Sequence, residues 1–261
     1  MSKDTLRQCA NLLSVTLALT VNILASVLPL NGQNTGEISD RFRVYFVPAG
    51  YVFAIWGIIY IGLIAFTIFQ FRPSQKESPR LRRLGTLFAL SGILNAAWLF
   101  AWHYNNFGLS VLIMFSLLGS LIASYLRLNV NGASVSRAEW WSVDLLLSIY
   151  LGWITVATVA NVSDWLYLTG WNGFGIAAPT WAAIMIAVAS VLGMLMALTR
   201  RDAGYLFVLV WSFVGIALKQ VAAPNVVSAA WIGAGFMLVL AVYSLIRPKT
   251  TLLFAGGRGA G

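Results

Sequence analysis

Residues 143–162 read VDLLLSIYLGWITVATVANV, a run in which Asp144 is the single charged residue. An α-helix of about 20 apolar residues crosses the roughly 30 Å hydrocarbon layer of a bilayer. Within lipid, the backbone polar groups of such a segment find partners when they bond to one another along a helix. The run therefore predicts a transmembrane helix.

Seven further runs of this kind divide the rest of the chain. The composition agrees with them, because 59% of the 261 residues are hydrophobic and 10% are charged, too few charges to cover a water-facing surface. We therefore expect an all-α polytopic integral membrane bundle of about eight transmembrane helices, forming one membrane domain over 1–261. The other seven runs lie at 12–30, 51–70, 84–103, 107–127, 178–198, 204–220 and 227–246.

The basic residues favour one orientation of these helices. With both termini in the cytoplasm, the outer segments hold three of the 17 basic residues, Arg41, Arg43 and Lys219. This distribution satisfies the positive-inside rule and predicts a bacterial-type inner (plasma) membrane protein with cytoplasmic termini. Because the basic residues stand between apolar runs and not along one polar face, the net charge of +9 does not indicate nucleic-acid binding. The other 14 are Lys3, Arg7, Arg72, Lys76, Arg80, Arg82, Arg83, Arg127, Arg137, Arg200, Arg201, Arg247, Lys249 and Arg258.

Metal and acid–base chemistry find little support in the sequence. Cys9 and His103 are the only cysteine and histidine, which excludes an intramolecular disulfide, a thiolate cluster and a multi-histidine metal site. We expect no metal site, no catalytic residue and no required cofactor. His103, at the outer end of the third helix, can be a polar cap or a pocket wall, but a plain boundary histidine is the favoured interpretation.

Two charged residues lie at helix ends. Asp144 is about one turn into the fifth helix, where it can reach the interface or pair with Arg137 or Arg127. Lys219 ends the seventh helix and is expected to extend to the outer interface. Proton binding at Asp144 and a covalent ligand on Lys219 are the alternatives, and the interfacial interpretation is favoured for both residues.

Aromatic and neutral polar residues concentrate in the second, third and fifth helices. Trp98 and Trp102 are four residues apart, and Tyr150 and Trp153 are three apart, so each pair shares a helix face. Such residues can also be ordinary packing and interhelical hydrogen bonds. We expect one wall of each helix to line an aromatic pocket beneath the loop at 31–50, formed by Trp56, Tyr60, Asn95, Trp98, Trp102, Tyr150, Trp153, Ala157 and Asn161.

At these residues the sequence resembles the TspO/translocator family, the tryptophan-rich sensory proteins that include the peripheral benzodiazepine receptor. Three stretches carry the resemblance: PAGYVFAIWGIIY at 48–60, LNAAWLFAW at 94–102 and YLGWITVATVAN at 150–161. They are similar to the family's segments in the second, third and fifth helices. The departures are Ala49 and Ile149 in place of prolines, and VSDW at 162–165 where the family has a basic residue.

The resemblance implies a five-helix unit over 12–165, with three additional helices over 178–247 that do not belong to the binding unit. It also implies a small apolar or aromatic ligand, such as a tetrapyrrole, bound within the membrane. A ligand-binding or sensory protein is the leading interpretation, a transporter or exporter of a small apolar molecule the second, and a light-dependent porphyrin-degrading enzyme the third. The lipid bilayer is the expected surrounding partner. A homodimer is possible, because small residues permit helices to pair, namely Gly108, Ser110, Gly119, Ser120 and Ser124.

Overall fold

The described residues of the chain form eight long helices. The computed structural model describes residues 1–28 and 30–246, and within these residues it contains no strand. Each predicted apolar run corresponds to one long helix, so the all-α membrane bundle is confirmed. The long helices are α1 (Lys3–Val27), α3 (Ile55–Gln70), α5 (Leu87–His103), α6 (Phe107–Arg127), α8 (Leu145–Leu168), α9 (Ala178–Arg200), α10 (Ala203–Lys219) and α11 (Pro224–Ile246).

The long helices differ in length and hydropathy, and therefore in whether they meet the requirements for a membrane span. In the described part of the chain, six are long and apolar enough to cross a membrane, counting the turn before α3 and the two short elements before α8 with those helices. The shorter apolar helices, α5 and α10, have 17 residues each, near the lower limit of about 17 residues for a span. Arg247, Lys249 and Arg258 lie outside the described residues.

Short elements connect the long helices. The segment from Thr35 to Asp40 forms helix α2, which a capping box between Asn34 and Glu37 closes at its N-terminus. The remaining short elements are η1 (Leu30–Gly32), η2 (Gly50–Ala54), η3 (Pro73–Gln75), α4 (Pro79–Leu84), α7 (Arg137–Glu139), the π-helical turn η4 (Trp140–Asp144) and η5 (Gly173–Gly175).

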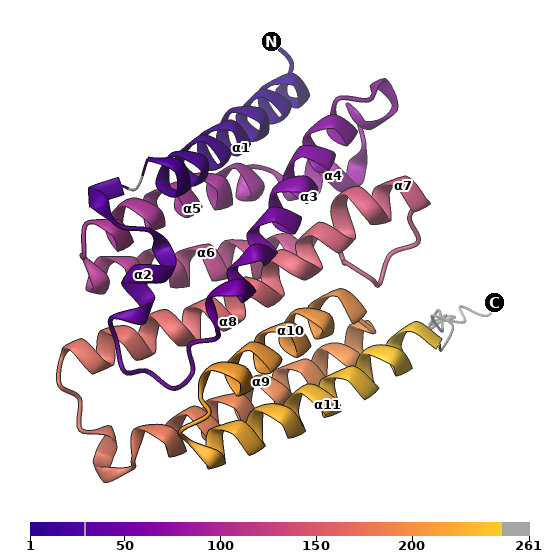
Figure 1. Ribbon diagram of the computed structural model, residues 1–261. Coiled ribbons are helices and arrows are strands. Elements are labelled where there is room, and N and C mark those ends of the chain that lie inside the picture. Colours follow the sequence, from indigo (N-terminus) through magenta and orange to yellow (C-terminus); the bar gives the residue numbers. More distant parts are fainter. Residues whose placement is uncertain (29, 247–261) are drawn as a thin grey trace, which may run out of the picture.

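Five helices close into a ring (Figure 1). Helix α1 packs against α5, α5 against α6, α6 against α8, α8 against α3, and α3 against α1 again. Helix α10 packs against α8 on one side and against α9 and α11 on the other. Helix α8 therefore belongs both to the ring and to the contact with the last three helices.

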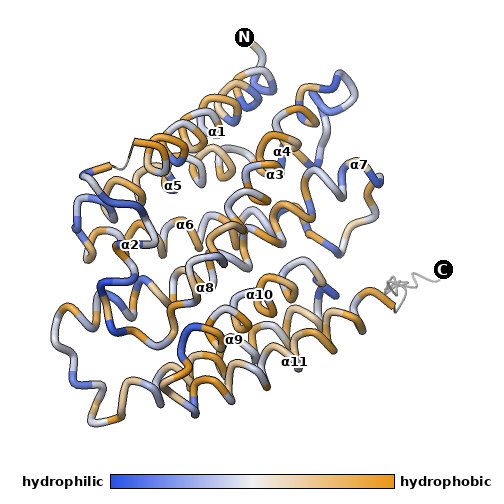
Figure 2. The backbone as a smooth tube through the Cα atoms, viewed as in Figure 1, coloured by the Kyte–Doolittle hydropathy of each residue, from blue (hydrophilic) through white to orange (hydrophobic). Residues whose placement is uncertain are grey.

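Polar residues gather at the two ends of the bundle (Figure 2). The N-terminus, α4, α7 and the last turns of α11 share one end (Figure 1). At that end Asp144 is fully buried, and its Oδ1 lies 2.5 Å from Nη2 of Arg80. Arg80 also contacts Glu139 at 2.8 Å. The expected partners of Asp144 were wrong, because α4 folds back into the bundle and brings Arg80 nearer than Arg127 or Arg137.

Three of the small residues expected to pair two copies are used inside the molecule. Ser110, Ser120 and Ser124 of α6 are buried. Ser110 bonds to Asn161 of α8, with its Oγ 2.9 Å from the amide nitrogen of that side chain. Ser110 therefore serves a contact between helices of one chain, and the expected homodimer stays a prediction.

Candidate functional site

A cavity lies at the end of the ring that α2 covers. Its volume is about 40 Å³. Six of the nine predicted site residues line it, namely Trp56, Trp98, Trp102, Trp153, Ala157 and Asn161. The other lining residues are Thr35, Ser39, Val47, Pro48, Phe53, Val156, Ala160 and Asp164.

The walls of this cavity are aromatic. Trp98 and Trp102 stack, with ring centroids 5.5 Å apart and an interplanar angle of 19°. Across from them, Trp153 meets Trp56 edge-to-face at 6.2 Å and Phe53 at 5.7 Å. These geometries are the favourable ones for aromatic pairs, so the rings hold one another in place.

Two polar groups of the cavity wall have no hydrogen-bond partner among the described residues. The indole nitrogen of Trp98 donates to Oδ1 of Asn161 at 3.0 Å, but the indole nitrogen of Trp153 is buried without an acceptor. Oδ1 of Asp164 is likewise buried without a donor. The cavity thus contains one free donor and one free acceptor, which a polar group of a ligand can satisfy.

The other three predicted site residues lie outside the cavity lining. Nδ2 of Asn22 donates to Oδ1 of Asn95 at 2.7 Å, and the Tyr60 hydroxyl donates to Oδ1 of Asn22 at 2.5 Å. Asn95 also lies beside the Tyr150 hydroxyl. This cluster links α1, α3, α5 and α8 within the ring, so Tyr60, Asn95 and Tyr150 connect helices.

The sequence interpretation missed two members of this region. Asn22 is one of few strongly polar residues within the first apolar run, and that isolation was the available signal. Asp164 entered the sequence interpretation only as part of the VSDW segment, which stands where the family has a basic residue. The burial of Asp164 depends on how α8 packs. Helical spacing was the available signal, because Asp164 follows Asn161 by three residues and Ala160 by four, and so continues the stripe of α8.

Residues 30–49, which include α2, form a lid over this cavity. The first segment of the lid, residues 30–35, is hydrogen-bonded to the end of α5. His103 is fully buried, with its Nε2 3.0 Å from the Thr35 hydroxyl and its Nδ1 3.2 Å from the carbonyl oxygen of Leu30. Asn31 donates to the carbonyl oxygen of His103 at 3.0 Å, and the indole of Trp102 donates to that of Thr35 at 3.3 Å. His103 is therefore a fastening point of the lid, and its interpretation as a plain boundary residue was wrong.

The second segment of the lid, residues 40–49, is fastened to α10. Lys219 forms an ion pair with Asp40. The side chain of Gln220 donates to the carbonyl oxygens of Val44 and Val47, at 3.2 Å each. The backbone of Ala49 donates to the carbonyl oxygen of Gly215 at 3.1 Å. The lid thus contacts both the ring and the last three helices.

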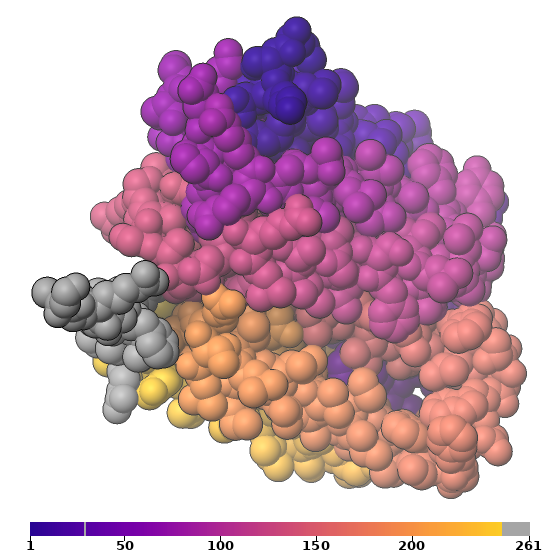
Figure 3. Space-filling view, turned by 180° about the vertical axis from the view of Figure 1, so that it is seen from behind, coloured from indigo at the N-terminus to yellow at the C-terminus, as the bar shows by residue number. Residues whose placement is uncertain are grey.

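A larger hollow lies between α8 and α9. Its volume is about 550 Å³, within the range of small-molecule sites. Seen from behind, the molecule is hollowed between the pink helices and the orange ones, and purple atoms of an earlier segment are visible inside (Figure 3). Its lining is Arg43, Val44, Phe46, Phe115, Thr158, Val159, Val162, Ser163, Leu166, Tyr167, Trp171, Asn172, Gly173, Ile176, Ala178, Trp181, Ala182 and Met185.

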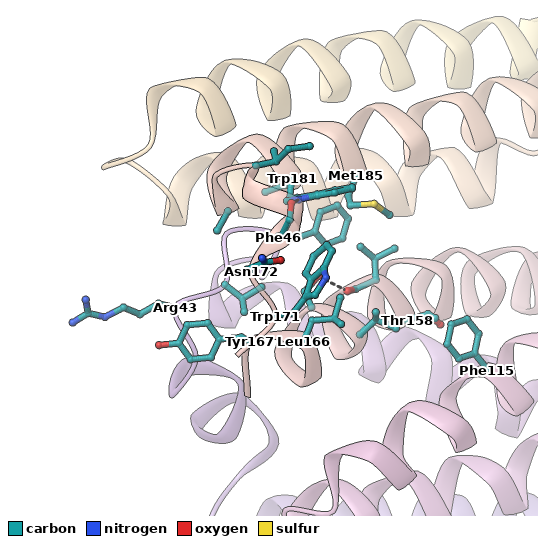
Figure 4. A pocket seen from close by; sticks show the side chains of 18 residues that line it. Arg43, Phe46, Phe115, Thr158, Leu166, Tyr167, Trp171, Asn172, Trp181 and Met185 are labelled. Carbon is teal, nitrogen blue, oxygen red and sulfur yellow. Dashed lines mark hydrogen bonds between the residues drawn. The ribbon is translucent and has the colours of Figure 1, made fainter. Parts of the chain in front are cut away.

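The lining of this hollow is mostly apolar. Trp171 and Trp181 lie against each other, with ring centroids 5.4 Å apart, and Arg43 points away from the other residues drawn (Figure 4). The hollow and the cavity use neighbouring residues of α8 and of the 43–48 segment. Sequence reasoning missed the hollow because it forms between two packed units and not along one helix face.

Comparison with known proteins gives one match. The family model described as TSPO-like protein matches residues 8–243. No curated protein and no solved structure matches the chain. The match extends beyond the 12–165 segment that carried the sequence resemblance, and it covers α9, α10 and most of α11.

Proposed function

Because the chain belongs to the TSPO-like protein family, we propose that it binds a planar apolar aromatic ligand in the cavity beneath α2. A tetrapyrrole is one such ligand. The observation that carries the proposal is the convergence of four tryptophans from α3, α5 and α8 on one cavity. Residues far apart in the sequence thus present stacking surfaces to the same space.

The cavity is closed in this conformation. A volume of about 40 Å³ holds a water molecule or two, whereas drug-sized ligands occupy roughly 300–1,000 Å³. Binding therefore requires α2 and the 41–49 segment to move away from the ring. Because those segments are fastened to both α5 and α10, ligand occupancy would change contacts along the outer end of the molecule, as a sensor requires.

The test is a titration with protoporphyrin in nanodiscs, followed by ligand absorbance and tryptophan fluorescence. Saturable binding at one site per chain, with quenching of the tryptophans, is the expected result. Lipid-only nanodiscs give the blank. Absence of saturable binding by monodisperse, folded protein, both to protoporphyrin and to uncharged planar aromatics, would contradict the proposal.

Transport of a small apolar molecule is the second candidate, and the large hollow favours it. The hollow and the cavity adjoin the same short segment, 43–48, so movement of that segment would connect them. Accumulation of ligand in sealed vesicles distinguishes this function from sensing. Equilibrium binding of the ligand without its accumulation in vesicles would favour the sensory function.

A further inference from the structure

A buried carboxyl group in the cavity lacks a counter-ion. Asp164, four residues before the end of α8, is 1% exposed, and its Oδ1 has no hydrogen-bond partner. An ionised carboxylate away from water is costly unless it is paired. The group faces the cavity, so an occupant of the cavity is positioned to supply the partner.

In the part of the chain that the structure describes, no basic group is paired with Asp164. The basic group whose charge reaches it is Lys219, and Lys219 is already paired with Asp40. Arg41, also at this end, donates to the side chain of Asn105 at 2.5 Å and lies over the rings of Phe42 and Phe107.

The rest of the cavity suits a positive charge. No Lys, Arg or His lines it, whereas Phe53 and four tryptophans do. The faces of aromatic rings attract cations, most strongly those of tryptophan, and the attraction grows where water is excluded. One carboxylate within an aromatic cage is the chemistry that recognises an organic ammonium or a flat heteroaromatic cation.

We propose that the cavity binds an aromatic organic cation, with its positive nitrogen near Asp164 and its apolar body between the tryptophans. This inference rests on the proposed function and narrows its ligand class. In its ionised form, paired with a cation, Asp164 favours positive groups and disfavours anionic substituents at this end of the cavity, so ligand charge as well as ligand shape affects the affinity.

Two probes of equal shape separate charge from shape. N-methylacridinium carries a fixed positive charge, and anthracene methylated on its central ring is its uncharged carbon isostere. In nanodiscs we expect the parent protein to bind the cation at least about tenfold more tightly than the isostere. Asp164→Asn should abolish this preference while changing the affinity for the isostere by less than about twofold.

Two further variants control the result. Glu77→Gln removes a carboxylate whose side chain is 78% exposed in the inner loop, so it should keep the preference. Asp164→Glu retains the charge and should keep a preference for the cation. Because Asn matches Asp in shape and carries no charge, Asp164→Asn should unfold at the parent's midpoint or above it.

The outcomes distinguish this inference from the proposed function. If the isostere binds and the cation shows no preference, or if Asp164→Asn keeps the preference, the charge inference is overturned and the aromatic site stands. If neither probe nor protoporphyrin binds the folded parent, both fail. A loss of folding in Asp164→Asn would reveal a structural role for the carboxyl group and would also overturn the inference.

Discussion

Trp98 and Trp153 face the same cavity but differ in their hydrogen bonding. The indole of Trp98 donates to Asn161, whereas that of Trp153 has no acceptor. Trp98 therefore holds α5 to α8 as well as lining the cavity. Trp153 supplies its ring and an unused donor, so changes at these two positions separate ligand contact from helix packing.

We expect Trp153→Phe to weaken binding of a planar ligand by roughly threefold to tenfold, because an aromatic contact contributes about 0.5–1.5 kcal/mol beyond the buried area. Its loss of stability should be smaller than that of Trp98→Phe, because removing an unpaired buried indole nitrogen offsets part of the cost of the lost ring volume. Trp98→Phe should weaken binding similarly and also destabilise the protein by about 1 kcal/mol, since it removes a buried hydrogen bond. Ligand titration and thermal unfolding measure the two effects.

Trp141 offers a matched control for these substitutions. It is 57% exposed and lies in η4, at the other end of α8 from the cavity. Trp140 is less suitable, because its indole donates to Asn131 at 3.3 Å. Equal ligand affinity in Trp153→Phe and Trp141→Phe would show that the aromatic stripe only packs helices.

At the scale of elements, α2 closes the cavity, and hydrogen bonds from His103 hold α2 in place. The imidazole bridges Leu30 and Thr35, on either side of the turn that leads into the helix. Truncation of this side chain removes both contacts at once. Because α2 has only six residues, it has little stability of its own and depends on such contacts.

We therefore expect His103→Ala to open the lid more often. In a Cys9→Ser background, a cysteine at the buried Ser39 position should react with a thiol reagent several-fold faster when His103 is replaced. Tyr104→Ala is the control, since Tyr104 is the next residue and is exposed. Equal labelling rates in the two variants would mean that the lid is held elsewhere.

The elements differ in how far the sequence predicted them. The eight long helices follow from hydropathy, because a span in lipid needs an uninterrupted apolar run. Helix α2 was assigned to a loop, although Asn34 and Glu37 have the spacing of a capping box. The stripe on α5 and α8 predicted the tryptophans of the cavity, since helical periodicity places them on one face. The same periodicity places Asp164, three residues after Asn161, on that face, but the sequence prediction of the site did not include it. The α8–α9 hollow depends on how helices pack, which periodicity does not determine.

At the scale of the whole molecule, the orientation predicted from the basic residues stays a prediction. In a Cys9→Ser background, a cysteine at the exposed Thr169 should react with an impermeant reagent on intact cells, and one at the exposed Ser74 should not. Asp202 is unsuitable as a reporter, because it is buried and accepts hydrogen bonds from Tyr125 and Ser148. Labelling of the Ser74 position from outside would reverse the topology.

The relation between the ring and the last three helices decides whether the binding unit ends at α8. The sequence resemblance implied that it does, yet α10 carries the second fastening of the lid. The two parts approach each other closely at Gly215, where a Cβ atom would come 2.2 Å from Cγ2 of Val52 and 3.1 Å from Cβ of Pro48. The cover of the cavity is therefore packed directly on α10.

We expect Gly215→Ala to displace the 48–52 segment, because the added methyl group overlaps Val52. Overpacking of this kind costs about 1–3 kcal/mol, and the shift should loosen the lid and alter ligand affinity several-fold. Gly235→Ala on α11 is the matched control, since a Cβ there meets nothing within 4 Å. The measurements are thermal unfolding, ligand titration and thiol labelling at position 39. If Gly215→Ala binds and labels as Gly235→Ala does, the last three helices are an addition to a self-sufficient five-helix binding unit.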